Sequence, residues 1–314
     1  MTAVPACRRV ALFVMAAGVL LACSCRAAPK ATALHRVFVD GIGRSVLIPI
    51  RPDRVVSLAP SVTEAIYELG FGDRLVGVSD FCKLPDGARA VARVGGILNP
   101  SLEAIRALHP DLLIATTSGN DPALPYQAEA LGVPLYTIQT PDIRATLQTV
   151  EALADLMGDP ARGARLASDL RRRLEAVRTR VAPLRAARVL YIVWGDPLIV
   201  PGRPAFLTDA LRAAGAASVT AEAASAWPTY DLESAIRSAP EVIVTSERNR
   251  GMAERLLRDP AWARVPAVRS RRVLVVSESI EQPGPQVIRG IEELAWRLYP
   301  EAFGREAGGA GEKN

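Results

Sequence analysis

The sequence predicts an α/β protein of two Rossmann-like lobes with central parallel sheets, joined by one long rigid α-helix. Short apolar strands alternate with helices along most of the chain, which is typical of parallel sheets covered on both faces. Residues 101–114 and 231–244 repeat the same order of residue types without a gap. Residues 161–181, between the two repeats, have the amphipathic pattern of a helix about 30 Å long.

The two repeats indicate lobes with the same architecture. Each begins with a capping residue, Ser101 or Asp231, and places a glutamate, Glu103 or Glu233, in the first helical turn. A short helix, a proline followed by an acid, and a buried strand complete each repeat. An acid in a first turn stabilises a helix by itself, but folding does not require the same acid in both lobes. The pair therefore favours a two-lobed binding protein that presents two symmetric carboxylates to a partner.

The first lobe is expected over residues 37–142. Alternating apolar and polar residues around Asp40 and Gly41 predict a β-hairpin over residues 37–48. Further strands are expected at residues 55–58, 75–78, 112–115 and 135–138, and helices at residues 62–69, 102–108 and 126–131. A loop at residues 79–100 separates the second of these strands from the second helix.

Residues 143–185 are expected to link the lobes, with one helix at residues 143–157 and the long helix at residues 161–181. The second lobe is expected over residues 186–303. Its predicted strands are residues 189–193, 242–244 and 273–276, and its predicted helices are residues 206–214, 232–238, 252–258 and 287–298. Residues 304–314 are rich in glycine and are expected to form a disordered tail.

The first 23 residues have the pattern of a signal peptide. Arg8 and Arg9 precede an apolar run at residues 10–22 that is too short to span a bilayer. Residues 20–23 (Leu-Leu-Ala-Cys) resemble a bacterial lipobox, in which Cys23 becomes the lipidated first residue; plain cleavage before Ala28 is the alternative. Residues 24–36 are expected to be a linker. The chain is therefore expected in the periplasm or on the outer face of the cytoplasmic membrane, held there only by a lipid anchor.

The composition excludes several functional classes. Hydrophobic residues make up 49% of the 314, which excludes global disorder. The net charge of +5 comes from arginines that are not interleaved with aromatic residues, so nucleic acid is not an expected partner. The two histidines, His35 and His109, are too far apart in sequence to indicate a metal site, and the sequence contains no nucleophile elbow, phosphate loop or dinucleotide motif. We expect no enzyme activity, no metal and no cofactor.

Four loops are expected to meet beyond the carboxyl ends of the strands, where open parallel sheets bind ligands. Their candidate ligand contacts are Phe81, Cys82, Gly96, Ile97, Trp194, Trp227 and Pro228. Three of these are aromatic residues in turns, in a chain with only 5% aromatics, which favours a site for a large, flat, partly apolar ligand. Trp262 and Trp296 have helical core spacing and are expected to pack in the interior.

Four segments resemble a known family. They are residues 55–64, 76–85, 94–103 and 108–111, which read VVSLAPSVTE, VGVSDFCKLP, VGGILNPSLE and LHPD. On these segments and on the long linking helix, the chain resembles the substrate-binding proteins of ABC importers of the helical-backbone type, the class III periplasmic binding proteins. Within that family it is most similar to the cobalamin-binding type. The resemblance extends from about residue 54 to about residue 299.

The resemblance implies capture of a small molecule between the lobes and its delivery to an ABC permease with an attached ATPase. It implies that Glu103 and Glu233 dock onto permease arginines, and that Phe81 and Trp227 contact the ligand. A loop of the second lobe is also implied to contact the ligand, at Glu278, Ser279, Ile280, Glu281 and Gln282. The expected ligand is cobalamin or a related corrinoid, carried by a monomer as cargo and not as a cofactor. A haem or iron–siderophore carrier of the same fold, or an anchored sensor subunit that binds a partner protein, stays open.

Overall fold

A computed structural model describes residues 34–86, 88 and 90–304. The predicted signal peptide, Cys23, most of the predicted linker and the predicted tail from residue 305 onward lie outside these residues. Within the described residues, no helix combines the length and the apolar character needed to cross a bilayer.

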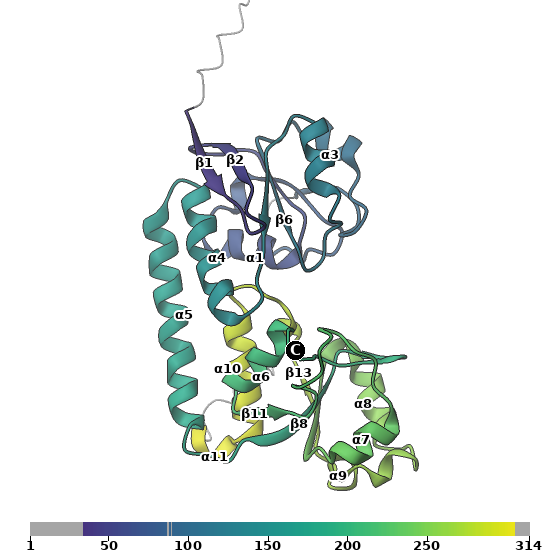
Figure 1. Ribbon diagram of the computed structural model, residues 1–314. Coiled ribbons are helices and arrows are strands. Elements are labelled where there is room, and N and C mark those ends of the chain that lie inside the picture. Colours follow the sequence, from purple (N-terminus) through teal and green to yellow (C-terminus); the bar gives the residue numbers. More distant parts are fainter. Residues whose placement is uncertain (1–33, 87, 89, 305–314) are drawn as a thin grey trace, which may run out of the picture. The chain divides into compact units, whose positions relative to one another are not determined.

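The first lobe is built on a five-stranded sheet in which every pairing is parallel (Figure 1). In spatial order its strands are β5 (Ala92–Arg93), β4 (Leu75–Val78), β3 (Val55–Ser57), β6 (Leu112–Thr116) and β7 (Leu135–Ile138). Its helices are α1 (Pro60–Glu68), α2 (Leu102–Ala107) and α3 (Leu124–Ala130). All five residues of the apolar β6 are buried, as expected for a central strand covered on both faces.

An antiparallel hairpin precedes this sheet, formed by β1 (His35–Val39) and β2 (Ser45–Pro49). The hairpin prediction is confirmed. The strand already begins at His35, so the last two residues of the predicted linker belong to it.

The second lobe contains a four-stranded sheet that is also parallel throughout. In spatial order its strands are β11 (Ala216–Ser218), β8 (Ala187–Ile192), β12 (Val242–Ser246) and β13 (Val273–Val276). Its helices are α6 (Phe206–Ala213), α7 (Leu232–Ser238), α8 (Arg250–Leu256), α9 (Pro266–Arg269), α10 (Val287–Leu298) and α11 (Pro300–Phe303). Trp262 is buried as predicted, and Trp296 on α10 is partly buried.

Two helices link the lobes, α4 (Ile143–Leu156) and the 22-residue α5 (Pro160–Val181), which lies alongside both lobes (Figure 1). The long helix is confirmed, with its start one residue earlier than predicted, at a proline that suits a first turn. A Cβ added to Gly163 would lie 2.5 Å from the Ala154 Cβ, so this glycine permits the close packing of α5 on α4. The guanidinium of Arg173 on α5 binds the Glu292 carboxylate on α10 at 2.6 and 2.9 Å and so connects the linking helix to the second lobe.

The sequence repeat has a structural basis in both lobes. The Asp111 N–H donates to the Arg54 carbonyl at 2.9 Å, and the Asp111 carboxylate accepts the Arg54 N–H at 3.1 Å. In the second lobe, the Glu241 N–H donates to the Arg188 carbonyl at 2.8 Å, and the Glu241 carboxylate accepts the Arg188 N–H at 3.2 Å. We call these two pairs the repeat clamps. Each ties the start of a central strand to the turn that enters the neighbouring strand.

The two arginines of the repeat clamps, Arg54 and Arg188, also bind the C-terminal ends of the short helices α2 and α7. Their guanidinium groups donate to carbonyl oxygens at the helix ends, one to Leu108 at 2.6 Å and the other to Ser238. The next residues, His109 and Ala239, both adopt the left-handed backbone conformation, with φ of 44° and 45°. The proline and acid of each repeat therefore serve folding.

Candidate ligand-binding site

A cavity of about 910 Å³ lies between the lobes. Its lining comes from segments that follow β3, β4, β5 and β6 in the first lobe and β8, β11, β12 and β13 in the second, including parts of α1 and α6. This position, beyond the carboxyl ends of parallel strands, is where open α/β sheets bind ligands. The volume is near the upper end of the range for small-molecule sites and suits a large ligand.

Eight of the twelve predicted ligand contacts line this cavity. They are Phe81, Ile97, Trp194, Trp227, Glu278, Ser279, Glu281 and Gln282. Cys82 and Ile280 do not line it, because their side chains are buried in the interior at 3% and 0% exposure. Gly96 and Pro228 are chain neighbours of lining residues and are not part of the lining themselves.

Cys82 supports the loop that carries Phe81. Its sulfur lies 3.1 Å from both the Thr63 and the Ser79 hydroxyl oxygens. The Arg93 guanidinium donates to the carbonyl groups of Ser79 at 2.9 Å and Cys82 at 2.7 Å. Because both ends of the turn are held, Phe81 projects outward with 65% of its surface exposed. The prediction that Cys82 contacts a ligand directly is therefore corrected: its side chain is buried and holds the turn, while the neighbouring Phe81 lines the cavity.

Asn120 holds together segments of the first lobe that line the cavity, and it was not among the predicted site residues. Its side-chain oxygen accepts the Thr116 N–H at 2.8 Å. Its amide nitrogen donates to the carbonyl groups of Leu58 at 3.0 Å and Ile97 at 2.8 Å. One buried amide therefore connects the ends of two strands to the loop that carries Ile97. The available signal was the polar run at residues 118–121 directly after a fully buried strand.

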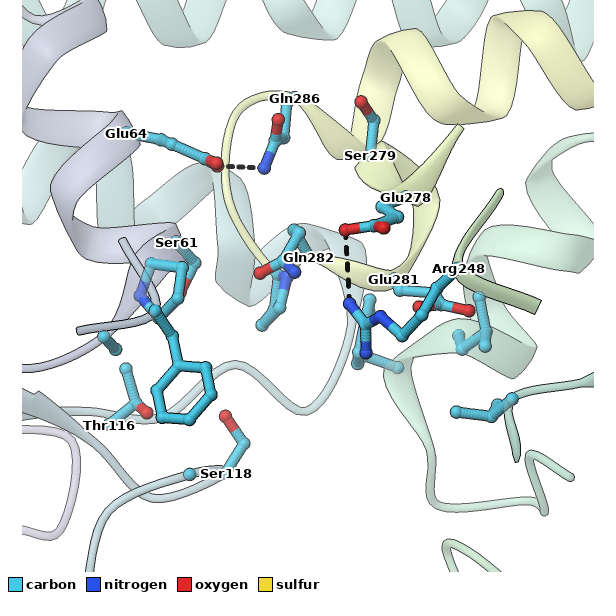
Figure 2. A pocket seen from close by; sticks show the side chains of 18 of the residues that line it. Ser61, Glu64, Thr116, Ser118, Arg248, Glu278, Ser279, Glu281, Gln282 and Gln286 are labelled. Atoms are coloured by element: carbon cyan, nitrogen blue, oxygen red, sulfur yellow. Dashed lines mark hydrogen bonds and ion pairs between the residues drawn. The ribbon is translucent and has the colours of Figure 1, made fainter. Parts of the chain in front are cut away.

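The second lobe contributes a charged wall. Figure 2 shows the Arg248 guanidinium donating to Glu278, at 3.2 Å, and the Lys83 ammonium of the first lobe lies 3.4 Å from the same carboxylate. Burial alone would raise the pKa of Glu278, but the two cations outweigh it and hold the pKa below its usual value. Glu281 behaves differently: burial raises its pKa, although the Tyr191 hydroxyl donates to it at 3.0 Å.

Glu64 of α1 also lines the cavity and was not among the predicted contacts. Its carboxylate accepts a hydrogen bond from the Gln286 side-chain amide, which belongs to the second lobe (Figure 2). Burial, followed by the nearby Glu68, raises the pKa of Glu64 to about 7, while Arg289 and Lys83 oppose the rise. No local sequence pattern could indicate this contact, because Glu64 and Gln286 lie more than 200 residues apart.

The charged lining is acidic on balance. It contains the carboxyl groups of Glu64, Glu247, Glu278 and Glu281 against the two cations of Lys83 and Arg248. Both cations form ion pairs with the Glu278 carboxylate, so each already has an acidic partner. The cavity lining, all of it within the described residues, includes no histidine, cysteine, methionine or tyrosine. In the described part of the chain, no cluster of three or more potential metal ligands occurs.

Glu103 and Glu233 occupy equivalent, exposed positions in the first turns of α2 and α7. Each helix is capped by the predicted residue: the Ser101 hydroxyl accepts the Ala104 N–H at 3.2 Å, and the Asp231 carboxylate accepts the Ser234 N–H at 2.6 Å. Neither glutamate makes a hydrogen bond or ion pair with another described residue. In this they differ from the acids of the repeat clamps.

Comparison with known proteins gives relatives of this chain that bind several ligands. The vitamin B12-binding protein of Vibrio parahaemolyticus is 30% identical over 247 residues, covering 77% of this chain and 88% of that protein. A Bacillus subtilis protein described as an uncharacterized ABC transporter substrate-binding lipoprotein is 26% identical, covering 84% of this chain and 85% of its own length.

Solved structures of similar proteins include a vitamin B12-binding and a heme-binding protein. The vitamin B12-binding protein BtuF of Vibrio cholerae is 28% identical with a TM-score of 0.72, covering 80% of this chain and 98% of that one. The apo form of the heme-binding protein RhuT from Roseiflexus sp. RS-1 is 27% identical, also with a TM-score of 0.72, covering 80% and 99%. A sequence profile of the family described as Periplasmic binding protein matches residues 55–279, and this chain belongs to that family.

Proposed function

We propose that this protein is the extracytoplasmic solute-binding component of an ABC importer that captures cobalamin or a related corrinoid between its lobes. The observation that carries the proposal is the cavity: it is large, lies between two parallel-sheet lobes, and has aromatic side chains on its loops. Phe81, Trp194 and Trp227 remain 65%, 49% and 44% exposed, so their faces are available to a flat ligand. The vitamin B12-binding relatives support the same ligand.

The chemistry of the lining favours a corrinoid over haem. Haem iron in proteins is held by histidine, cysteine, methionine or tyrosine, and none of these lines the cavity formed by the described residues. A corrinoid that brings its own axial ligands needs no such side chain. The two propionates of haem would also meet an acidic cavity whose cations already pair with Glu278, whereas the neutral amides of a corrinoid find carboxylate acceptors there.

A haem or iron–siderophore carrier is the second candidate. The similarity to the heme-binding RhuT, equal in TM-score to that with BtuF, favours it. An anionic chelate requires free cations, and Arg248 is the one arginine in the described lining. Arg203, the other arginine considered for such a site, is not part of this lining. An anchored sensor subunit that binds a partner protein is the third candidate.

The exposed glutamates supply the proposed docking contacts with the permease. Glu103 and Glu233 occupy the same place in the two lobes and carry charges that no described residue neutralises. Two equivalent carboxylates suit a permease that presents arginines at two matching positions. Docking through both lobes brings the cavity between them to the permease, whose attached ATPase powers transport.

Export and anchoring complete the proposal. The signal peptide and Cys23 lie outside the described residues, and the lipobox-like sequence supports attachment by lipid to the outer face of the cytoplasmic membrane. The Bacillus relative, described as a lipoprotein, supports the same arrangement. The protein would act as a monomer whose only membrane contact outside the transport complex is its lipid.

Calorimetric titration of the chain from Arg26 onward with cyanocobalamin, haemin and a ferric hydroxamate tests the ligand. We expect tight one-to-one binding of cyanocobalamin. Phe81→Ala should weaken it about tenfold or more, because an exposed aromatic face at the ligand is lost. Tyr126→Ala is the matched control, since Tyr126 is 76% exposed on α3 and does not line the cavity. If only haemin or only the ferric hydroxamate binds, that compound replaces cobalamin as the proposed ligand. If none of the three binds, the hypothesis of an anchored sensor subunit is favoured.

A further inference from the structure

The loop at residues 282–286 brings the second lobe into contact with the first. It follows a 3-10 helix at Glu278–Glu281, leads into α10, and lies against α1 and α4. A Cβ added to Gly284 would lie 3.1 Å from the Ser61 carbonyl oxygen, so the two backbones approach closely at this point. Pro283 and Pro285 face Val62 across the same contact. A movement of one lobe relative to the other must change this contact.

Glu64 lies where the interlobe contact meets the cavity. It is on α1, it lines the cavity, and its carboxyl group is hydrogen-bonded to Gln286 at the end of the loop (Figure 2). The partner is a neutral amide and not a cation. One carboxyl group therefore meets the first lobe, the second lobe and the space that the ligand fills.

The charged groups around Glu64 come from every element that packs near it. Glu68 lies one turn along α1, Arg289 is on α10, and Lys83 is in the loop after β4. The pKa of Glu68 is itself raised by burial, with Arg289 and Arg173 of α5 opposing the rise. Arg173 is already bound to Glu292. Burial and the like charge of Glu68 outweigh the two cations, Arg289 and Lys83, and raise the pKa of Glu64 to about 7.

We propose that Glu64 takes up a proton from solvent when the ligand is captured, so that ligand binding and proton binding are coupled at this interlobe contact. The inference rests on the proposed function and extends it. The loop at residues 282–286 already covers one side of Glu64, and a bound ligand replaces water on the cavity side. This further loss of water disfavours the carboxylate. A neutral carboxyl group keeps its hydrogen bond, because the Gln286 amide can donate to it or accept from it.

The sign of the pH dependence follows from linkage. Because the bound state holds the proton more tightly, affinity is highest below pH 7 and falls as the pH rises above the pKa of the free protein. The loss approaches a factor of about ten per pH unit when one full proton is taken up. Titration of wild-type protein with cyanocobalamin between pH 5.5 and 8.5 measures this slope. Repeating it in two buffers of different ionisation enthalpy counts the protons bound.

Two variants assign the proton to Glu64. Glu64→Gln keeps the shape of the neutral acid and should make the affinity independent of pH across this range. Gln286→Arg places a cation beside the carboxylate and should move the onset of the affinity loss to lower pH. Glu281→Gln is the matched control, because Glu281 is the other buried carboxyl group of the cavity with a raised pKa. It should retain the wild-type slope.

The outcomes separate this proposal from the proposed function. Cyanocobalamin binding without proton uptake, or a slope that persists in Glu64→Gln, overturns the coupling and leaves the carrier role intact. If the pH dependence of affinity disappears in Glu281→Gln instead, the proton is taken up by Glu281, and the assignment to Glu64 is overturned. Failure of any corrinoid to bind at every pH overturns the function. Carbon-13 NMR of the Glu64 carboxyl group in the ligand-free chain tests whether its pKa is raised; titration near the ordinary glutamate value of 4.5 would overturn the proposal.

Discussion

The two lobes are alike in the short helix and clamp of each repeat and different in the residues that line the cavity. Both carry a capped short helix with an exposed first-turn glutamate, and both carry a repeat clamp. At the cavity they differ in charge: the wall of the first lobe carries the hydroxyl groups of Ser61, Thr116 and Ser118 and one carboxyl group, Glu64, whereas the wall of the second carries three carboxyl groups, one of them in the ion pair of Arg248 and Glu278. Figure 2 shows these two walls facing each other.

The difference suggests separate tasks for the two regions, contact with a partner for the repeat helices and ligand binding for the cavity. A partner that meets both lobes in the same way keeps the two outer glutamates equivalent. A ligand that lacks two-fold symmetry requires no such equivalence, so the cavity walls can diverge. Likeness within the repeat is therefore not sufficient to assign a function, because the repeat clamps are equally alike and serve the fold.

The largest expected effect comes from the equivalent outer glutamates. Replacing Glu103 and Glu233 together by lysine should reduce ligand-dependent transport to background, because two cations would then face the permease arginines. Ligand affinity should stay within about twofold, since neither residue lines the cavity. Transport by the reconstituted importer and calorimetry on the isolated chain give the two readouts.

A charge-matched control distinguishes docking from a general effect of net charge. Glu129 on α3 and Glu254 on α8 are exposed glutamates, one in each lobe, outside the first helical turns. The double variant Glu129→Lys with Glu254→Lys should transport normally. Equal losses in the two double variants, or normal transport in both, would contradict the docking assignment.

Most of the fold was accessible from the sequence because long elements repeat their pattern several times. The apolar face of α5 recurs over 22 residues, and the prediction placed its C-terminal end correctly at Val181. The strands β5, β9 (Trp194–Gly195), β10 (Leu198–Ile199) and β11 were not predicted. They contain two or three residues each, which is too few for any period to register.

The site was less accessible, because its geometry depends on contacts between distant segments. Exposed aromatic residues in turns identified the cavity walls, since burial in the core could not explain them. Cys82 looked like part of the same wall, but its side chain points into the interior, and adjacent residues in a turn often face opposite ways. Glu64 was missed because its partner Gln286 lies 222 residues away and no local pattern marks it. Asn120 was missed because two of its three partners lie 23 and 62 residues away, and the polar run at residues 118–121 was the one local signal.

The repeat clamps provide the next largest effect. Asp111→Ala and Glu241→Ala should each lower the free energy of unfolding by about 2 kcal/mol, because each removes a charged acceptor of backbone N–H groups. Glu103→Ala should cost less than about 1 kcal/mol, the usual contribution of an acid in a first helical turn. Urea denaturation measures all three. Similar losses for Glu103→Ala and Asp111→Ala would contradict the division between docking and folding acids.

The stabilisation that Glu241 of the second repeat clamp contributes should depend on pH. Burial would raise the pKa of Glu241, but hydrogen bonds from the Arg185 side chain and the Arg188 N–H outweigh burial and lower it. Its stabilising effect is therefore complete above the unfolded pKa of about 4.5 and is lost as the pH falls through the lower folded value. The difference in unfolding free energy between wild type and Glu241→Ala should accordingly shrink as the pH falls below about 4.5.

The smallest expected effect concerns the charged wall of the second lobe. Glu278→Gln removes the carboxylate that engages Arg248 and Lys83 and leaves both cations able to bind a propionate. Haemin affinity should rise about tenfold, equivalent to one charge-assisted hydrogen bond of about 1.4 kcal/mol. Cyanocobalamin, which carries neutral amides, should change by less than about threefold. Glu247→Gln is the control, because Glu247 lines the same cavity but forms its ion pair with Arg250, outside the lining. An equal gain for haemin in both variants would mean that net charge, and not release of the paired cations, decides which ligand the cavity accepts.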